Sequence, residues 1–200
     1  TLGRLEMVLR ERLRPGDTVL VGGKLPEGIA ADDLAALCER IHSLGAEVPL
    51  DTAAVRLAQV ERIRPLVIKP NRLELGEITG LPTGDLSQCV EAARLLHQHG
   101  AQRVLVSLDR DGAFLLDQEG LLLAQAPEVE VRSPVGAGDA MLAWFTAALL
   151  AGCTREEALC RAVAAGSAAC LHYGTHAPSR EEVEALLPQV RAVPAGHPLG

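Results

Sequence analysis

Aromatic residues are nearly absent from this 200-residue chain, which has one Trp, one Tyr and two Phe. Hydrophobic residues still make up 48% of it, so a core must be built from Leu, Ala and Val. The length allows one globular domain with a sizeable core. We expect that domain to span residues 1–190, followed by a tail over 191–200.

The chain also lacks any apolar run of about 18 residues, the length that a membrane-spanning helix requires. Its first residues are amphipathic and charged, unlike a secretory signal peptide. A net charge of −7 argues against nucleic acid as a partner. Five scattered cysteines without a CxxC pair are typical of reduced thiols. We therefore expect a cytoplasmic protein that binds neither membranes nor nucleic acid.

Short apolar runs alternate with helical segments along the chain. The predicted strands are 17–23, 46–52, 65–70, 102–108, 112–118, 120–126 and 128–133. The predicted helices are 31–44, 53–61, 72–79, 85–99, 137–152, 154–171 and 179–188. This alternation predicts parallel βαβ units with helices on both faces of a sheet. The close pair 112–118 and 120–126 predicts an antiparallel hairpin at one edge. We expect a three-layer α/β fold with a mainly parallel sheet, which binds ligands beyond the carboxyl ends of its strands.

The segment VGAGDAM, residues 135–141, places two glycines and an aspartate at the start of an apolar helix. Gly136 and Gly138 let the backbone approach a ligand closely, and the helix start supplies unpaired N–H groups. Asp139 aims a carboxylate at this anion site, an arrangement that suits phosphoryl transfer. The amides would stabilise the moving charge while Asp139 accepts the proton of the attacking hydroxyl. The alternative is a simple N-cap aspartate after a glycine turn, which these residues alone do not exclude.

Asn71 and Glu74 follow the predicted strand 65–70 and lie one helical turn apart. At the carboxyl end of a strand they suit a Mg²⁺ ion held through water. The alternative is a capping box, with Asn71 as the N-cap and Glu74 at the third helical position. The loop VSLDRDGAF adds Ser107 and a turn that closes on Gly112, which by itself indicates only a β-turn.

Five segments, in this order and spacing, resemble the PfkB (ribokinase-like) family of sugar kinases. They are GGKLPEG, KPNRLEL, VSLDRDGA, SPVGAGDAMLAWFTAAL and AVAAGSAACLHYGT. The resemblance covers about residues 2–188 and is greatest to the branch of 1-phosphofructokinases and tagatose-6-phosphate kinases. It implies a ribokinase-like fold and the use of ATP and Mg²⁺ to phosphorylate a sugar phosphate.

The resemblance also implies a role for each matched position. Asp139 matches the family's catalytic base, which also contacts the sugar. The backbone of Gly136, Ala137, Gly138 and Asp139 matches the family's anion hole, which binds the nucleotide. Asn71 and Glu74 match the residues that organise Mg²⁺ and the ATP phosphates, with Lys69 beside them. The further nucleotide-binding residues that it implies are Ser107, Leu108, Asp109, Arg110, Asp111, Gly112, Gly166, Ser167 and Gly174. Gly23, Leu25 and Pro26 match a loop near the sugar, and Lys24 lies within this loop, so the resemblance implies that Gly23 and Lys24 lie at the substrate.

The chain departs from the family pattern at three points. Lys24 replaces a serine in the sugar loop, and Trp144 replaces a small residue in the helix after Gly138. About the first third of a family chain, which carries the lid strands and an aspartate and glycine pair that binds sugar, has no counterpart. Because such a gap would leave a strand edge and apolar helix faces uncovered, we expect a homo-oligomer or a complementing N-terminal segment.

Two classes of function remain open from the sequence. The first is a kinase that transfers the γ-phosphate of ATP to a hydroxyl of a ketohexose phosphate, with conversion of fructose 1-phosphate to fructose 1,6-bisphosphate as the expected reaction. The second is a catalytically incompetent nucleotide-binding fragment. Kinases for tagatose 6-phosphate, another sugar or a nucleoside are alternatives on the same fold.

Overall fold

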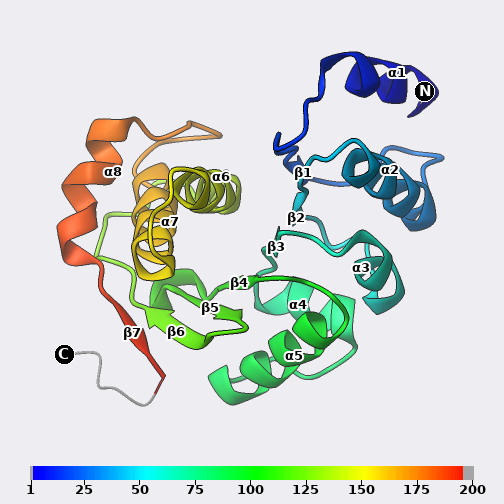
Figure 1. Ribbon diagram of the computed structural model, residues 1–200. Helices are drawn as coiled ribbons and strands as arrows, with labels where there is room; N and C mark the ends of the chain where they lie inside the picture. The colour runs from blue at the N-terminus through cyan, green and yellow to red at the C-terminus, as the bar shows by residue number, and fades with distance from the viewer. Residues whose placement is uncertain (1, 196–200) are drawn as a thin grey trace. The chain divides into compact units, whose positions relative to one another are not determined.

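The computed structural model describes residues 2–195, and the chain divides into two compact units (Figure 1). Unit 1 extends to Val104, and unit 2 begins at Leu105. Both units combine helices with strands of their own, as expected for an α/β protein. No helix within residues 2–195 is long and apolar enough to cross a membrane.

Unit 1 is built around three short parallel strands, β1 (Val21–Gly22), β2 (Pro49–Asp51) and β3 (Val67–Ile68). Leu50 of β2 pairs with both Val21 and Ile68, so β2 lies between the other two strands. Ile68 also pairs with Val104, the first residue of β4. The regular strands are shorter than those predicted, although Thr18 and Glu47 form one further parallel bridge. The parallel arrangement brings the carboxyl ends of β1, β2 and β3 to one edge.

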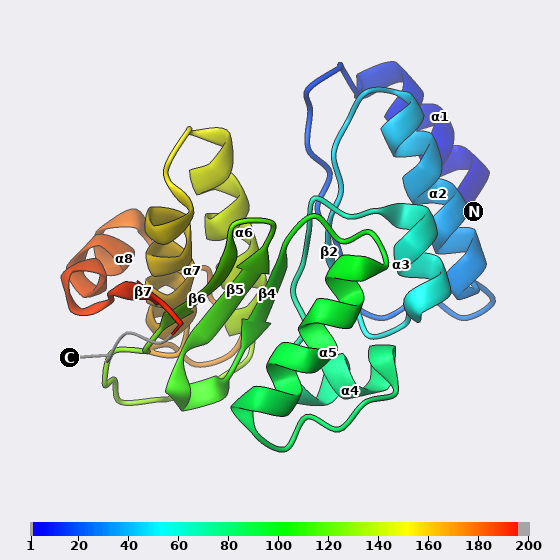
Figure 2. The ribbon, with the colours of Figure 1, turned by 60° about the horizontal axis from the view of Figure 1, so that its bottom comes forward.

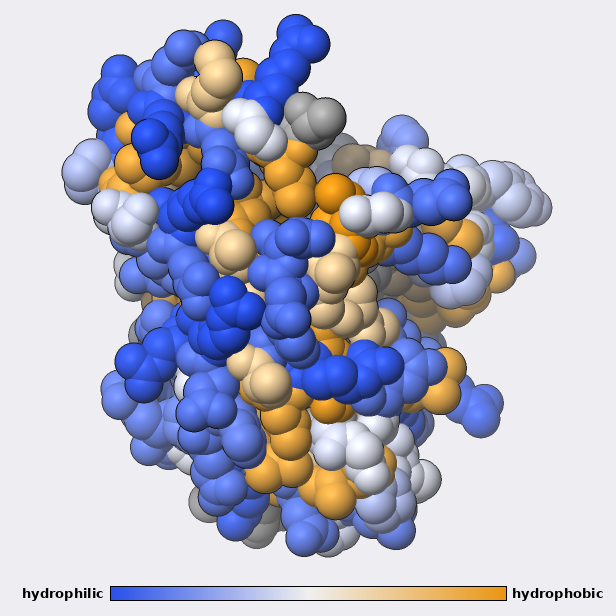
Figure 3. Space-filling model, turned by 90° about the vertical axis from the view of Figure 1, so that its right-hand side faces the viewer, coloured by the Kyte–Doolittle hydropathy of each residue, from blue (hydrophilic) through white to orange (hydrophobic). Residues whose placement is uncertain are grey.

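The helices of unit 1 are α1 (Leu2–Arg12), α2 (Ala31–Ser43), α3 (Leu57–Ile63), α4 (Arg72–Thr79) and α5 (Leu86–Gln98). Helix α2 packs on α3, and α4 packs on α5 (Figure 2). Their inward positions are filled by small and aliphatic side chains, because the sequence has almost no aromatic residues. On the side that carries α1 to α3, Figure 3 shows mostly hydrophilic residues with apolar ones between them.

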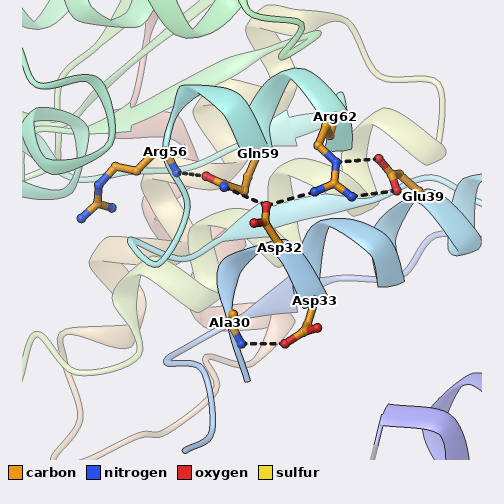
Figure 4. A network of polar contacts seen from close by, with 7 residues as sticks. All are labelled: Ala30, Asp32, Asp33, Glu39, Arg56, Gln59 and Arg62. Carbon is orange, nitrogen blue, oxygen red and sulfur yellow. Dashed lines mark hydrogen bonds and ion pairs between the residues drawn. The ribbon is translucent and has the colours of Figure 1, made fainter. Parts of the chain in front are cut away.

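A polar network joins the outer surfaces of α2 and α3 (Figure 4). The guanidinium of Arg62 donates to both carboxylate oxygens of Glu39, at 2.9 and 3.1 Å, and to Asp32 at 3.0 Å. Gln59 also donates to Asp32, at 3.0 Å. The charged side chains Asp32, Glu39 and Arg62 are solvent-exposed, so each ion pair contributes little stability. The network links the two packed helices α2 and α3.

Strand β4 (Val104–Ser107) begins at the last residue of unit 1 and continues into unit 2. It is followed in spatial order by β5 (Ala113–Asp117), β6 (Gly120–Ala124) and β7 (Ala192–Pro194). Strands β5 and β6 form the predicted antiparallel hairpin, in which Asp117 pairs with Gly120. Figure 2 shows β4, β5 and β6 side by side. Strand β7 pairs antiparallel with β6, although it lies in the segment 191–200 for which the sequence predicts only a tail.

The helices of unit 2 are α6 (Ala137–Leu150), α7 (Arg155–Ala169) and α8 (Arg180–Leu186), with short 3₁₀ turns η1 (Asp109–Asp111) and η2 (Leu187–Gln189). Helix α7 packs against α6, α8 and the strands, and its residues 162–169 are all buried. Alanine and glycine dominate that run, which allows helices to approach closely.

The predicted strand at 128–133 is wrong. Residues 128–133 form no regular strand, and the N–H groups of Arg132 and Ser133 both donate to the carbonyl of Cys170, at 2.8 and 3.4 Å. The alternating pattern of VEVR therefore marks an extended connection. It is tied to the carboxyl end of α7 and not to a neighbouring strand.

Candidate functional site

Helix α6 begins with a backbone turn that only glycine adopts easily. Gly136, the N-cap, has φ of +87° in the left-handed region. The N–H of Ala137 donates to the carbonyl of Pro134 at 3.3 Å, and the N–H of Ala140 donates to that of Gly136 at 2.9 Å. The N–H groups of Gly138 and Asp139 have no acceptor among residues 2–195. The turn thus presents two adjacent donors at the positive end of a helix dipole, the chemistry that binds an anion.

The carboxylate of Asp139 lies in the first turn of α6 and is exposed. It makes no hydrogen bond or ion pair with the described part of the chain, and α6 has no side-chain cap. The alternative interpretation of Asp139 as an N-cap is therefore wrong, because Gly136 occupies that position. An exposed carboxylate beside two unpaired amides can accept a proton next to a bound anion.

The loop between α7 and α8 flanks the start of α6. A Cβ atom placed on Gly136 would lie 3.7 Å from the Cα of Thr175, and the guanidinium carbon of Arg132 lies 5.7 Å from the ring centre of Tyr173. Gly174, with φ of +73°, forms the bend of this loop. The structure therefore places predicted residue Gly174 in a loop that borders the anion-binding turn.

A hydrogen bond between His172 and Glu182 closes the base of the same loop. His172 Nε2 lies 2.6 Å from Glu182 Oε1. The N–H of Ser179 donates to Glu182, and this bond together with the contact to His172 holds the pKa of the Glu182 carboxyl below its usual value. The carboxylate is therefore ionised near neutral pH and anchors both ends of the loop.

The predicted nucleotide loop 107–112 connects β4 to β5 through η1. Its N–H of Leu108 donates to the carbonyl of Gly112 at 2.8 Å, and Asp109 adopts φ of +54°, which is rare for a residue other than glycine. A Cβ atom on Gly112 would lie 2.1 Å from the carbonyl oxygen of Ala124, so only glycine fits there. The side chain of Leu108 is buried, whereas Asp109, Arg110 and Asp111 are exposed. Their binding role stays a prediction.

Gly166 and Ser167 lie inside α7 and are buried. A Cβ atom on Gly166 would lie 2.6 Å from the Cγ of Met141, so the absence of a side chain lets α6 and α7 pack closely. This close packing explains why a glycine, and not a larger residue, occupies this position of α7. A contact of either residue with the nucleotide stays a prediction.

Lys69, Asn71 and Glu74 lie in unit 1, at and just beyond the end of β3. Lys69 is only 4% exposed, and its ammonium lies 3.2 Å from the carboxylate of Asp51. Asn71 Oδ1 accepts from the N–H of Glu74 at 2.9 Å, while Glu74 Oε2 accepts from the N–H of Asn71 at 2.8 Å. The capping box that the sequence offered as an alternative is thus present.

The capping box limits how Asn71 and Glu74 could hold Mg²⁺. Each side-chain oxygen has two lone pairs, so an oxygen that accepts one N–H can still accept a hydrogen bond from a metal-bound water. No group of three or more His, Cys, Asp or Glu side chains within the described chain is placed to hold a metal directly. The residues present therefore fit a water-mediated site.

Gly23 and Lys24 follow β1 at the same edge of unit 1. Gly23 has φ of +88°, its N–H donates to the carbonyl of Asp51 at 2.9 Å, and its carbonyl accepts from the hydroxyl of Thr52 at 2.7 Å. The side chain of Lys24 is exposed. The sequence interpretation singled out neither Asp51 nor Thr52. Their position at the carboxyl end of a predicted strand was the available signal.

Comparison with known proteins shows the same family for nearly the whole chain. Residues 3–182 match the pfkB family carbohydrate kinases. The chain belongs to this family. The predicted α/β, ribokinase-like fold and the predicted family are therefore confirmed.

Individual kinases of this family show how much of a relative the chain represents. It is 32% identical to 1-phosphofructokinase of Bacillus subtilis over 181 residues, which are 90% of this chain and 59% of the relative. It is 34% identical to D-tagatose-1-phosphate kinase of Klebsiella oxytoca, covering 89% and 58%. The structure of phosphofructokinase-2 from Escherichia coli in complex with substrates and products matches with a TM-score of 0.84 and 28% identity, covering 94% and 61%. The chain thus spans about three fifths of these relatives.

Proposed function

We propose that this chain forms part of an ATP-dependent sugar-phosphate kinase that converts fructose 1-phosphate to fructose 1,6-bisphosphate. The observation that carries the proposal is the start of α6, where the unpaired N–H groups of Gly138 and Asp139 lie beside an uncommitted carboxylate. A plain helix cap has no need of this pairing. Membership of the pfkB carbohydrate kinases supports the reaction class.

The proposed reaction uses these groups in one transfer. The Asp139 carboxylate accepts the proton of the 6-hydroxyl, whose oxygen forms a bond to the γ-phosphorus as the bond to the β-phosphate oxygen of ATP breaks. The unpaired N–H groups of Gly138 and Asp139, within the turn 136–139, stabilise the negative charge on the transferred group. ADP leaves with the electron pair of the broken bond, and the proton stays on Asp139 until solvent removes it.

The remaining predicted residues are proposed to bind the nucleotide and Mg²⁺. Ser107 to Gly112 and Gly174 would contact the nucleotide, while Asn71 and Glu74 would hold Mg²⁺ through its waters. When bound, the ion would neutralise charge on the phosphates. The buried Lys69 lies two residues before Asn71, and its pairing with Asp51 fixes the ammonium in place.

The acceptor is proposed to be a ketohexose phosphate. Relatives named 1-phosphofructokinase and D-tagatose-1-phosphate kinase support this class, at 32% and 34% identity. Fructose 1-phosphate is the first acceptor to test, followed by tagatose 1-phosphate and tagatose 6-phosphate. One structure of the Escherichia coli phosphofructokinase-2 is described as a tetrameric inhibited form, so we also propose self-association, which light scattering tests.

The deciding experiment measures MgATP-dependent ADP formation with each acceptor and without sugar. Asp139→Asn removes the base while preserving shape, and we expect the rate to fall about 10²–10⁴-fold. Glu156→Gln is the matched control, because Glu156 is also an exposed acid in the first turn of a helix of unit 2. Both variants lose a negative charge at a helix start. A difference between their rates therefore reports the loss of the proposed base, Asp139, and not the loss of charge.

Each outcome of this assay has a defined meaning. Sugar-dependent turnover that Asp139→Asn abolishes and Glu156→Gln retains would support the proposal. Binding of ADP without turnover of any acceptor would favour the second candidate, a nucleotide-binding fragment that lacks catalysis. The observation that favours this candidate is that the chain covers 59% of its Bacillus subtilis relative.

A further inference from the structure

The carboxyl end of β2 contacts both ligand-binding segments predicted in unit 1. Two consecutive residues there, Asp51 and Thr52, form hydrogen bonds with the N–H and the carbonyl of Gly23. The Asp51 carbonyl accepts from the N–H of Gly23 at 2.9 Å, and the Thr52 hydroxyl donates to the carbonyl of Gly23 at 2.7 Å. Gly23 has φ of +88°, so these two bonds set the direction in which the chain leaves β1.

The geometry of the Thr52 hydroxyl leaves it little freedom. It accepts from the N–H of Ala54 at 3.2 Å, which orients its own hydrogen toward Gly23, and the residue is only 8% exposed. Removing the hydroxyl would leave the Gly23 carbonyl without this partner inside the protein. Among the described residues, no backbone hydrogen bond joins 24–28 to another element. The position of this loop therefore depends on Gly23.

The other side of β2 is fixed by β3. The N–H of Lys69 donates to the carbonyl of Leu50 at 2.9 Å, and its ammonium lies 3.2 Å from the Asp51 carboxylate. Because Lys69 is buried, this pair is held more firmly than an exposed one. The end of β2 is thus a rigid support between Lys69 and the loop that carries Lys24.

We propose that Thr52 is a positioning residue for the acceptor site. By holding Gly23 it fixes the loop 23–28, so that the exposed ammonium of Lys24 meets the phosphate group of the sugar phosphate. Thr52 itself does not touch the acceptor. The proposal rests on the proposed function for the identity of the ligand, and on the contacts of Thr52 alone for the control of the loop.

The first test reads the loop without any activity. Trypsin cleaves after Lys24, and mass spectrometry measures the initial rate of cleavage at the Lys24–Leu25 bond. We expect Thr52→Val to raise that rate about three- to tenfold, the factor that corresponds to losing one hydrogen bond. Thr52→Ser retains the hydroxyl and should cleave at close to the original rate.

A matched control exists elsewhere in unit 1. The buried hydroxyl of Thr79 donates to the carbonyl of Leu75 at 2.7 Å and accepts from the N–H of Leu81 at 3.3 Å, the same chemistry as that of Thr52. Thr79→Val should leave cleavage after Lys24 unchanged. Equal acceleration in Thr79→Val and Thr52→Val would overturn the proposal, as would no acceleration in Thr52→Val.

The second test adds the ligands. We expect fructose 1-phosphate to slow cleavage after Lys24 in the unmodified chain, and Thr52→Val to need about three- to tenfold more of it for the same protection. In turnover assays, Thr52→Val should raise the KM for the acceptor by the same factor and leave the KM for ATP constant. Thr52→Ser should restore both the protection by fructose 1-phosphate and the KM for the acceptor. A rise in both KM values would contradict a role confined to the acceptor loop.

Failure of the two proposals can be told apart. If no acceptor is turned over or protects the loop, the proposed function fails, while faster cleavage in Thr52→Val alone still shows that Thr52 controls the loop. If turnover is intact and Thr52→Val behaves like the unmodified chain in both tests, the positioning role fails and the kinase stands.

Discussion

The starts of α4 and α6 solve the same problem in opposite ways. Every helix leaves its first N–H groups without partners. In α4, the side chains of Asn71 and Glu74 satisfy each other's N–H groups in a closed capping box. In α6, Gly136 turns the backbone, no side chain caps the helix, and the carboxylate of Asp139 stays exposed.

This difference separates a helix start that holds the fold from one suited to bind a ligand. In α4, Asn71 Oδ1 and Glu74 Oε2 each already accept a backbone N–H, and each keeps a lone pair for a metal-bound water. At the start of α6, the N–H groups of Gly138 and Asp139 and the carboxylate of Asp139 have no partner within residues 2–195, although an Asn, Asp or Ser at the N-cap could have supplied one. Stability and ligand binding should therefore respond differently to substitution at the two sites.

The largest expected effect on stability is at Gly136. Gly136→Ala places a Cβ on a residue with φ of +87°, which costs about 1–2 kcal/mol of unfolding free energy. The nearest atom would lie at 3.7 Å, so the cost is backbone strain and not a clash. Urea unfolding followed by the fluorescence of Trp144, the single tryptophan, reports on unit 2. Gly136→Asn should recover part of the loss, since Asn tolerates this conformation; equal losses would argue against strain.

The next effect is at the capping box. Asn71→Ala removes the acceptor for the N–H of Glu74 and should cost about 1 kcal/mol. Far-UV circular dichroism during urea unfolding measures it, because unit 1 has no tryptophan. Asn71→Ser keeps a capping oxygen and serves as the control. A loss as large for Ser as for Ala would show that the amide, and not the cap, matters.

The smallest effect on stability is expected at Asp139, where the effect on activity is largest. Asp139→Asn removes only an exposed charge near a helix start, worth about 0.3–1 kcal/mol at low salt. Because salt screens such interactions, the difference should shrink further at 1 M NaCl in the Trp144 assay. A loss above about 1 kcal/mol that persists in high salt would mean that Asp139 makes a structural contact, contrary to the comparison.

Local signals in the sequence located most helices well. Helix α4 spans Arg72–Thr79, as predicted, because Asn71 and Glu74 mark its start and Gly80 allows the left-handed turn at its end. The start of α6 at Ala137 and the hairpin of β5 and β6 were also predicted. These features depend on residues within one or two turns of each other, so a single sequence contains their cause.

Features that depend on distant partners were missed or misassigned. The segment 128–133 has a strand pattern, yet its N–H groups bond to Cys170, which lies some forty positions further along the chain. Strand β7 was missed because Ala192–Pro194 carries no strand pattern of its own and pairs with β6. The packing of Gly166 against Met141 was likewise missed, because the two residues lie on different helices. Whether Gly166 also borders a nucleotide stays a prediction.

The sequence by itself determined the α/β alternation, the family and the residue types of an anion-binding turn, because short-range periodicity and ordered motifs encode them. Only the tertiary structure decided that α6 has no side-chain cap and that the Asp139 carboxylate is exposed. It also decided that Asn71 and Glu74 form a capping box, and that Asp51 and Thr52 connect Gly23 to Lys69. Hydrogen bonds between strands far apart in the chain carry this information, since the partner of a polar group is set by where the backbone brings it.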